Sequence, residues 1–276
     1  MNMKNPSALA AEYVKAGKLE RVKIIDTHTH MDGVAGVSMP TGGGIEACIK
    51  LMDEQNIESI WCSSHSDLFA PSVNVNVETE RLMHAYPDRV KGYYCFNPNH
   101  KDVYLEHIGK VLTDSGYVGL KFLPNYHNHD LDGYGYDEAL AFANKHELIV
   151  LSHTWGDKPQ NSCKEVEEVL LRRHDLTFII GHSAPGDLDT AIRLVYQHDN
   201  AYLDLCDIHR HSGIVEKMVN KLGSEHILFG TDMPWYDPAY CIGSVLFAKI
   251  TDRDRENIFY KNAERLLQNT KKDKKQ

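Results

Sequence analysis

The 276-residue sequence has no run of about 18 apolar residues, which is the length that a membrane-spanning helix requires. It has no excess of positive charge either, because 30 Lys and Arg stand against 39 Asp and Glu, for a formal charge of −9. Nucleic-acid binding needs clustered basic residues, and the only basic run is the C-terminal tail 270–276. The composition therefore argues against a membrane or nucleic-acid partner and leaves a small molecule as the expected one.

The sequence also lacks CxxC pairs, a GxSxG motif and a secretory signal. Charged residues interrupt the short Ala-rich stretch of segment 1–22, which leaves no apolar core of signal length. We therefore expect a cytoplasmic protein with reduced thiols and no catalytic serine or cysteine. The 6 cysteines are scattered along the chain: Cys48, Cys62, Cys95, Cys163, Cys206 and Cys241.

Short apolar runs alternate with helical segments along the whole chain. Nearly continuous apolar runs are typical of parallel strands that are covered on both faces. About eight strand–helix units predict an α/β fold, the (β/α)8 TIM barrel, as a single domain over 1–276 with a short N-terminal extension 1–22. An open doubly wound sheet is the rival, but its usual GxGxxG turn is absent. The expected strands are 23–27, 59–63, 90–96, 117–122, 148–152, 176–180, 201–205 and 227–229.

The spacing of apolar residues between these runs predicts the helices. The clearest cover 45–55 and 166–173, where apolar side chains recur at intervals of three and four residues. The last helices are expected between residues 240 and 268.

Histidine is the unusual component, with 16 copies. A random chain of this composition would contain about one HxH pair, so the motif alone is weak evidence. Three pairs occur, at 28/30, 127/129 and 209/211. The first is the best placed, because it follows an expected strand, and residues two apart on a strand share one face.

Polar residues directly follow four of the expected strands. His28 and His30 follow the first, His153 the fifth, His182 the sixth and Asp232 the eighth. Burying such groups costs several kcal/mol unless a partner satisfies them, and barrel active sites lie at this end of the strands. The pattern predicts a metal site in which three of these imidazoles and the carboxylate are ligands, a set that suits Zn²⁺, Mn²⁺, Fe²⁺ or Co²⁺.

Other residues of the expected loops are candidates for substrate binding. Trp155 and Trp235 would give the mouth an aromatic lining, with plain packing as the alternative. His127 lies in a Gly-, Asn- and Asp-rich stretch after the fourth strand, where a substrate contact and an ordinary loop position are both open. His65, after the second strand, would also face the pocket.

Six motifs resemble the amidohydrolase superfamily in order and spacing, over about residues 24–267. The most similar branch is the amidohydrolase-related one that includes aminocarboxymuconate-semialdehyde decarboxylase. This resemblance implies a distorted TIM barrel that binds one divalent metal, usually zinc and sometimes manganese. It also implies a homodimer. The motifs are DTHTH (26–30), GLKF (119–122), LSHTWG (151–156), IGHSAPG (180–186), LFGTDMPW (228–235) and NAERLL (262–267).

The resemblance also implies roles for single residues. His182 would act as acid or base beside the metal-bound water, with Asp232 sharing the proton transfer. Lys121 falls where relatives with two metals carry a carboxylated lysine. Here it would be a pocket cation, such a bridge to a second metal, or a structural residue. The implied metal ligands are His28, His30, His153 and Asp232.

The implied reaction is hydrolysis of a small amide, ester or lactone by a metal-activated water. Nonoxidative decarboxylation of a small unsaturated or aromatic acid in the same site is the alternative. A metal-binding protein without catalysis is the third. Lys121 and His127 would hold an anionic group of the substrate. An arginine near the metal would favour decarboxylation, because the decarboxylating relatives use such arginines.

Overall fold

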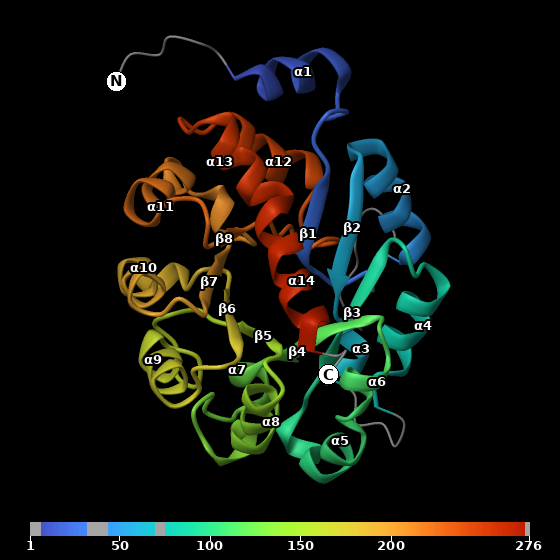
Figure 1. The fold of residues 1–276 in the computed structure, drawn as a ribbon, viewed down its shortest axis with the longest axis vertical. Helices are drawn as coiled ribbons and strands as arrows, with labels where there is room; N and C mark the ends of the chain where they lie inside the picture. Colours follow the sequence, from blue (N-terminus) through green and yellow to red (C-terminus); the bar gives the residue numbers. More distant parts are fainter. Residues whose placement is uncertain (1–6, 32–43, 70–74, 274–276) are drawn as a thin grey trace.

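The computed structural model describes residues 7–31, 44–69 and 75–273. Its centre is a sheet of eight parallel strands that lie side by side in chain order (Figure 1). The expected TIM barrel is confirmed, and each expected strand boundary lies within two residues of the observed one. The strands are β1 (Ile24–Thr29), β2 (Ile57–Cys62), β3 (Val90–Cys95), β4 (Tyr117–Phe122), β5 (Ile149–His153), β6 (Thr177–Gly181), β7 (Ala201–Asp204) and β8 (Ile227–Leu228).

The barrel closes through the segment that follows β8. The backbone N–H of Thr27 donates to the carbonyl of Phe229 at 2.9 Å, and that of His30 donates to Met233 at 2.8 Å. In the other direction, the N–H of Asp232 donates to the carbonyl of His28 at 2.8 Å. These bonds fix the residues after β8 beside the DTHTH motif of β1.

Helices surround the sheet and connect its strands. The α-helices are α1 (Ala8–Ala16), α2 (Ile45–Gln55), α3 (His65–Phe69), α4 (Val77–Ala85), α5 (Lys101–His107), α6 (Lys110–Thr113), α7 (Pro124–His127), α8 (Tyr134–Lys145), α9 (Cys163–Arg172), α10 (Leu188–Gln197), α11 (Ile214–Leu222), α12 (Pro238–Leu246), α13 (Asp252–Glu256) and α14 (Asn262–Asp273). The short ones are the 3₁₀ turns η1 (Pro98–His100), η2 (Pro185–Asp187) and η3 (Ile208–Arg210) and the π-helical turn η4 (Asn257–Lys261).

Helix α2 has the expected bounds, whereas α9 begins three residues earlier than expected. Ser162 caps α9 by accepting a hydrogen bond from the N–H of Lys164, and the carboxylate of Glu165 accepts from the N–H of Ser162. This reciprocal capping satisfies N–H groups that the helix leaves open, so it extends the helix toward its N-terminus.

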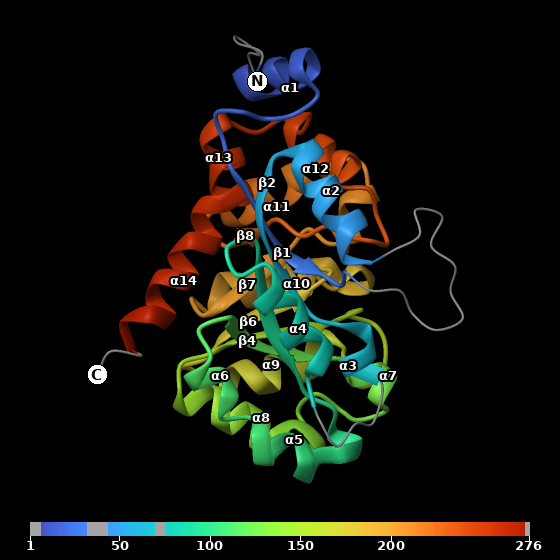
Figure 2. The same cartoon turned by 90° about the vertical axis from the view of Figure 1, so that its right-hand side faces the viewer.

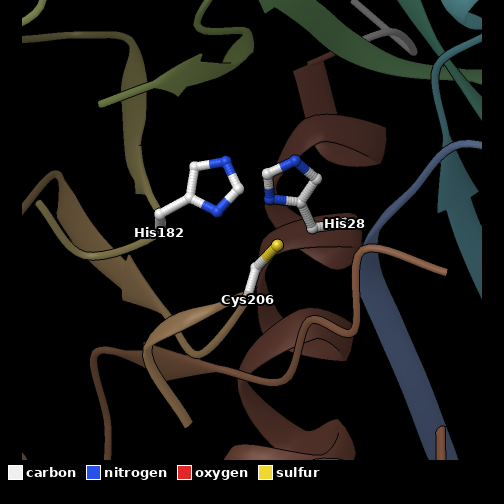
Figure 3. A group of neighbouring side chains, drawn as sticks. All are labelled: His28, His182 and Cys206. Carbon is white, nitrogen blue, oxygen red and sulfur yellow. The ribbon is translucent and has the colours of Figure 1, made fainter. Parts of the chain in front are cut away.

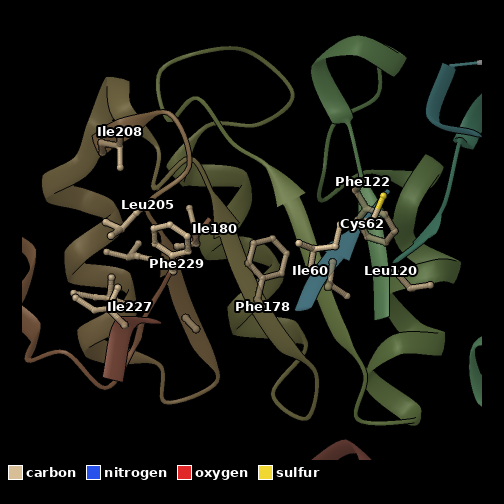
Figure 4. Packing of buried hydrophobic residues seen from close by; sticks show 14 of the residues in the cluster. Ile60, Cys62, Leu120, Phe122, Phe178, Ile180, Leu205, Ile208, Ile227 and Phe229 are labelled. Carbon is tan, nitrogen blue, oxygen red and sulfur yellow. The ribbon is translucent and has the colours of Figure 1, made fainter. Parts of the chain in front are cut away.

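Two apolar clusters stabilise the barrel. The larger one fills the space between the strands and the helices, and Figure 4 shows part of it around Phe178, Ile180 and Phe229. The smaller one lies inside the barrel and contains Ile149, Leu151 and nine other buried residues of the strands and α14. Alternate residues of one strand therefore point to the two clusters, as the two-residue period of a strand requires.

Helix α14 crosses the barrel at the amino-terminal ends of the strands. Its residues Ala263 and Leu266 belong to the inner cluster, so they close this end of the barrel. Figure 2 shows α14 on the opposite side of the barrel from α3 and α7, which leaves the carboxyl-terminal ends of the strands for a site.

The N-terminal extension is docked on the barrel. Ser7 donates a hydrogen bond to Asp252 at the start of α13, and Leu9 and Leu19 are buried in the outer cluster. The expected basic tail 270–276 begins inside α14, and residues 274–276 lie outside the described part of the chain. Within the described ranges, no helix has the length and apolar character needed to cross a membrane.

Candidate active site

A cavity of about 490 Å³ opens at the carboxyl-terminal ends of the strands. The residues that line it come from segments spread over the chain, as expected for the mouth of a barrel. They are His30, His65, Phe69, Leu123, Tyr126, His153, Trp155, His182, Asp207, Asp232, Trp235 and Tyr236.

Three of the four expected metal ligands meet at the inner end of this cavity. The ligand atoms of His28, His30 and Asp232 all lie within 4.8 Å of one another. Oδ1 of Asp232 is 3.2 Å from Nε2 of His30 and 3.9 Å from Nε2 of His28. A tetrahedral ion with bonds of about 2.1 Å separates its ligand atoms by roughly 3.4 Å, so small shifts would let all three bind one cation.

The two imidazoles of this group are held by their other nitrogens. Nδ1 of His28 donates to Oδ2 of Asp204 at 2.8 Å, and Nδ1 of His30 donates to the carbonyl of Ser63 at 2.8 Å. In both rings the lone pair is therefore on Nε2, the nitrogen that faces Asp232. Metal-binding histidines in proteins are oriented in this way.

His153, the fourth expected ligand, does not belong to this group and contacts it through the ring of His182. Its Nδ1 is 2.8 Å from Nε2 of His182, and the His182 ring centroid lies 4.9 Å from that of His28. Nε2 of His153 and Nδ1 of His182 are both buried without a hydrogen-bond partner. Buried polar atoms in proteins nearly always have a partner. These two open nitrogens therefore fit a site that binds a cation and a substrate.

The backbone of the site lies in an unusual conformation. His182, Ser183 and Ala184 have φ angles of 60°, 55° and 51°, and Asp232 has 63°. Residues other than glycine avoid this left-handed region, where each costs about 1–3 kcal/mol. Such conformations collect at functional sites because the surrounding structure holds side chains where they are needed.

The electrostatics of the site match the needs of a metal ion. Burial lowers the pKa of His30 and of His182 to about 4 and holds the pKa values of His28 and His153 well below their ordinary range. Burial alone would raise the pKa of Asp232, but the neighbouring rings of His30, His28 and His182 hold it well below its usual value. Neutral imidazoles and an ionised carboxylate are the forms that bind metals.

Lys121 lies behind the cavity wall. Its Nζ is 2.6 Å from Nε2 of His28, and the side chain is fully buried. Burial lowers the pKa of its amine. A cation and the amine cannot share the single lone pair of Nε2, so Lys121 must move away when a metal binds His28.

The candidate substrate residues divide into two kinds. Trp155 and Trp235 line the cavity, and the Trp155 ring stacks on His182 at 5.2 Å and 12°. His65 lines it too and accepts a hydrogen bond from the indole N–H of Trp235 at 3.2 Å. His127 does not line the cavity. Its Nδ1 bonds the hydroxyl of Tyr136 at 2.7 Å and its Nε2 donates to the carbonyl of Leu68 at 2.8 Å, so neither nitrogen is free for a substrate.

Sequence reasoning missed three residues of the site. Asp204 holds His28, and a carboxylate inside the otherwise apolar run 201–205 was the signal that could have revealed it. Asp207 and Tyr236 line the cavity and hydrogen-bond each other, with Tyr236 donating. Asp207 also pairs with Arg210 at 3.1 Å. No simple pattern marks these last residues, because they lie in loops.

A parallel barrel with buried histidines and an aspartate at its mouth defines a class, the metal-dependent TIM-barrel enzymes. A family model described as "Amidohydrolase" matches residues 25–268. The chain therefore belongs to the amidohydrolase family, whose members, decarboxylases included, are metal-dependent enzymes. No curated protein matches the chain.

Solved structures support the fold. 2,6-Dihydroxybenzoate decarboxylase from Rhizobium is 16% identical with a TM-score of 0.73, covering 90% of this chain and 99% of its own. Dihydroxybenzoic acid decarboxylase from Polaromonas, solved with manganese and 2-nitroresorcinol, is 16% identical with a TM-score of 0.71 (90% and 97% covered). 5-Carboxyvanillate decarboxylase from Novosphingobium aromaticivorans, also with manganese, is 12% identical with a TM-score of 0.69 (90% and 96%). At such identities the likeness establishes the fold alone.

Proposed function

We propose that the protein removes CO₂ from a small, flat carboxylic acid in a metal-dependent reaction. The observation that carries this proposal is the aromatic wall over the metal group. Rings of five residues surround the cavity, namely Phe69, Tyr126, Trp155, Trp235 and Tyr236. Such a wall suits a planar unsaturated or aromatic body, and an apolar site favours a step in which a charged carboxylate leaves as neutral CO₂. The fold-related structures named as decarboxylases of aromatic acids support the same reaction.

Nε2 of His28, Nε2 of His30 and the carboxylate of Asp232 would hold the cation. His153 would be the fourth ligand, through its Nε2, which has no hydrogen-bond partner. A bound divalent ion supplies Lewis acidity toward the oxygens of the substrate. Zinc is the first expectation from the resemblance, and manganese is the ion in two of the fold-related structures.

His182 would handle the proton that decarboxylation requires. If Nε2 of His153 binds the cation, the proton of that ring is on Nδ1, where it donates to Nε2 of His182. The proton of His182 is then on Nδ1, which has no partner within the protein. The ring of His182 stacks on Trp155, one of the aromatic residues on which a flat substrate would rest.

Hydrolysis of a small amide, ester or lactone is the second candidate, and one observation favours it. Among the described residues that line the cavity, none is Arg or Lys, and segments 32–43 and 70–74 contain neither type. The described part of the cavity wall therefore lacks the arginine that would favour decarboxylation. Decarboxylation remains our first choice because a substrate with one carboxylate, held by the metal, needs no second cation.

Turnover in ¹⁸O-labelled water separates the two reactions. We expect the Mn²⁺-loaded protein to release CO₂ from a member of a panel of hydroxybenzoates and unsaturated acids, without ¹⁸O in the organic product. Replacing His182 by Asn should lower this rate about 10²–10⁴-fold while the metal stays bound. Labelled oxygen in a product from the ester, lactone and amide panel would show hydrolysis instead. No turnover of any panel by metal-loaded protein would favour a non-catalytic role.

The homodimer that the family resemblance implies stays a prediction. Analytical ultracentrifugation would test it.

A further inference from the structure

A second group of ligand atoms shares His28 with the first. The ligand atoms of His28, His182 and Cys206 all lie within 4.8 Å of one another. All three side chains are buried, with exposed fractions of 0%, 2% and 0%. Figure 3 shows the sulfur of Cys206 directed toward the gap between the two imidazole rings. The proposed decarboxylation gives this thiol no task.

One carboxylate positions all three residues of this group. Oδ2 of Asp204 accepts from Nδ1 of His28 at 2.8 Å. Its Oδ1 accepts from the backbone N–H of His182 at 2.9 Å and from that of Cys206 at 3.0 Å. Groups that orient ligands in this way are typical of metal sites. Asp204 therefore fixes the positions of the three residues, and an ion in this group must displace either the Asp204 bond on Nδ1 of His28 or the Lys121 contact on Nε2.

The donor atoms of the two groups select different ions. His28, His30 and Asp232 offer two nitrogens and an oxygen, which Mn²⁺ accepts well. His28, His182 and Cys206 offer two nitrogens and a sulfur, which Zn²⁺, Co²⁺ and Cd²⁺ prefer. Nδ1 of His182 has no hydrogen-bond partner, so it can act as a ligand for such an ion.

We propose that His28, His182 and Cys206 form a second, thiolate-containing cation position that competes with the first. A neutral imidazole has one unprotonated nitrogen, so His28 can serve only one position at a time. Binding there replaces the proton of the Cys206 thiol by a metal–sulfur bond and releases that proton to solvent. The ion also occupies His182. A soft cation at this position therefore inhibits the activity of the Mn²⁺-loaded enzyme. This inhibition rests on the proposed function, whereas the second cation position does not.

Co²⁺ titration of the full-length, metal-free protein tests the site without an activity assay. A Co²⁺–thiolate bond gives a charge-transfer absorption in the near ultraviolet. We expect this band in the wild type and its loss in both Cys206→Ser and Cys206→Ala. Cys163→Ala, which removes a buried thiol of α9, is the matched control and should keep the band. Stabilisation of both Cys206 variants by Mn²⁺ would show that their fold and first position are intact.

The Co²⁺ titration separates the second cation position from the proposed function. Co²⁺ bound without the band, or a band that persists in both Cys206 variants, would overturn the second position and leave the proposed function standing. Failure of the wild type to bind Co²⁺ and Mn²⁺ would overturn both. In the Mn²⁺-loaded enzyme, Zn²⁺ should inhibit Cys206→Ser about tenfold more weakly than the wild type. Equal inhibition would contradict the competition.

Discussion

The inside of the barrel contains two layers that differ sharply although the same strands build them. In the lower layer, Leu151 and Tyr202 pack in the inner apolar cluster that α14 closes. Two residues further along the same strands, His153 and Asp204 belong to the polar site. Residues two apart on a strand share a face. The same face of a strand therefore carries an apolar side chain in the lower layer and an ionisable one two residues later.

The two layers are stabilised in different ways. The lower layer gains from the burial of apolar surface, which needs no further partner. The upper layer contains buried nitrogens without partners, strained backbone at His182 and Asp232, and neutral imidazoles around an ionised carboxylate. Such a layer costs stability by itself and becomes satisfied when a cation and a substrate bind. The lower layer of the barrel therefore supplies the stability, and the mouth supplies the chemistry.

The largest effect is expected from the carboxylate of the upper layer. Asp232→Ala removes the only oxygen donor of the first ligand group, so metal content and turnover should both fall to background. Elemental analysis after dialysis against Mn²⁺ measures the first quantity. Asp189→Ala, on the exposed side of α10 where it pairs with Lys217, is the matched control and should behave as the wild type. A full equivalent of metal in Asp232→Ala would separate this residue from the metal.

Neighbouring truncations on β5 test the contrast between the layers. Leu151→Ala creates a cavity in the lower layer and should cost about 2–5 kcal/mol of unfolding free energy, with metal stoichiometry unchanged. His153→Ala, two residues away, should cost the metal-free protein far less and should weaken metal binding instead. Urea unfolding gives the unfolding free energy of each variant, and metal titration gives its metal affinity and stoichiometry. The contrast fails if the two variants show the same pattern.

A smaller effect is expected at Asp204, which supports the site from behind. Asp204→Asn keeps the shape of the side chain but removes the charge that holds Nδ1 of His28. Metal affinity should fall about 10–100-fold, because residues that orient ligands have effects of this size. Competition with a chelator of known affinity measures the change. An unchanged affinity would mean that His28 needs no such support.

The smallest effect concerns His127, a buried histidine outside the cavity. Burial lowers its pKa to about 4, whereas an unfolded histidine has a pKa of about 6.5. Between these values the unfolded chain binds the proton more strongly, so the stabilising contribution is complete above pH 6.5 and is lost as the pH falls toward 4. From pH 7 to pH 5, the metal-free wild type should lose about 2 kcal/mol more than His127→Gln. Parallel losses in the two proteins would show that His127 does not titrate in this way.

The sequence was sufficient to predict the barrel because its strands are short, apolar and separated by helical segments. It also placed His28, His30 and Asp232 correctly at the strand ends, where the structure brings them together. It could not show that His127 turns away from the cavity, because its partners Leu68 and Tyr136 meet it only in the folded chain. Asp204 escaped notice because it lies inside an expected strand, and because the His28 ring that it holds is 176 residues away along the chain.

Anomalous X-ray diffraction from crystals of the Mn²⁺-reconstituted protein tests the central claim most directly. The account predicts one anomalous peak at the barrel mouth, within bonding distance of Nε2 of His28, Nε2 of His30 and the carboxylate of Asp232. The absence of any peak at these side chains in fully reconstituted protein, or a peak bound only elsewhere, would contradict it.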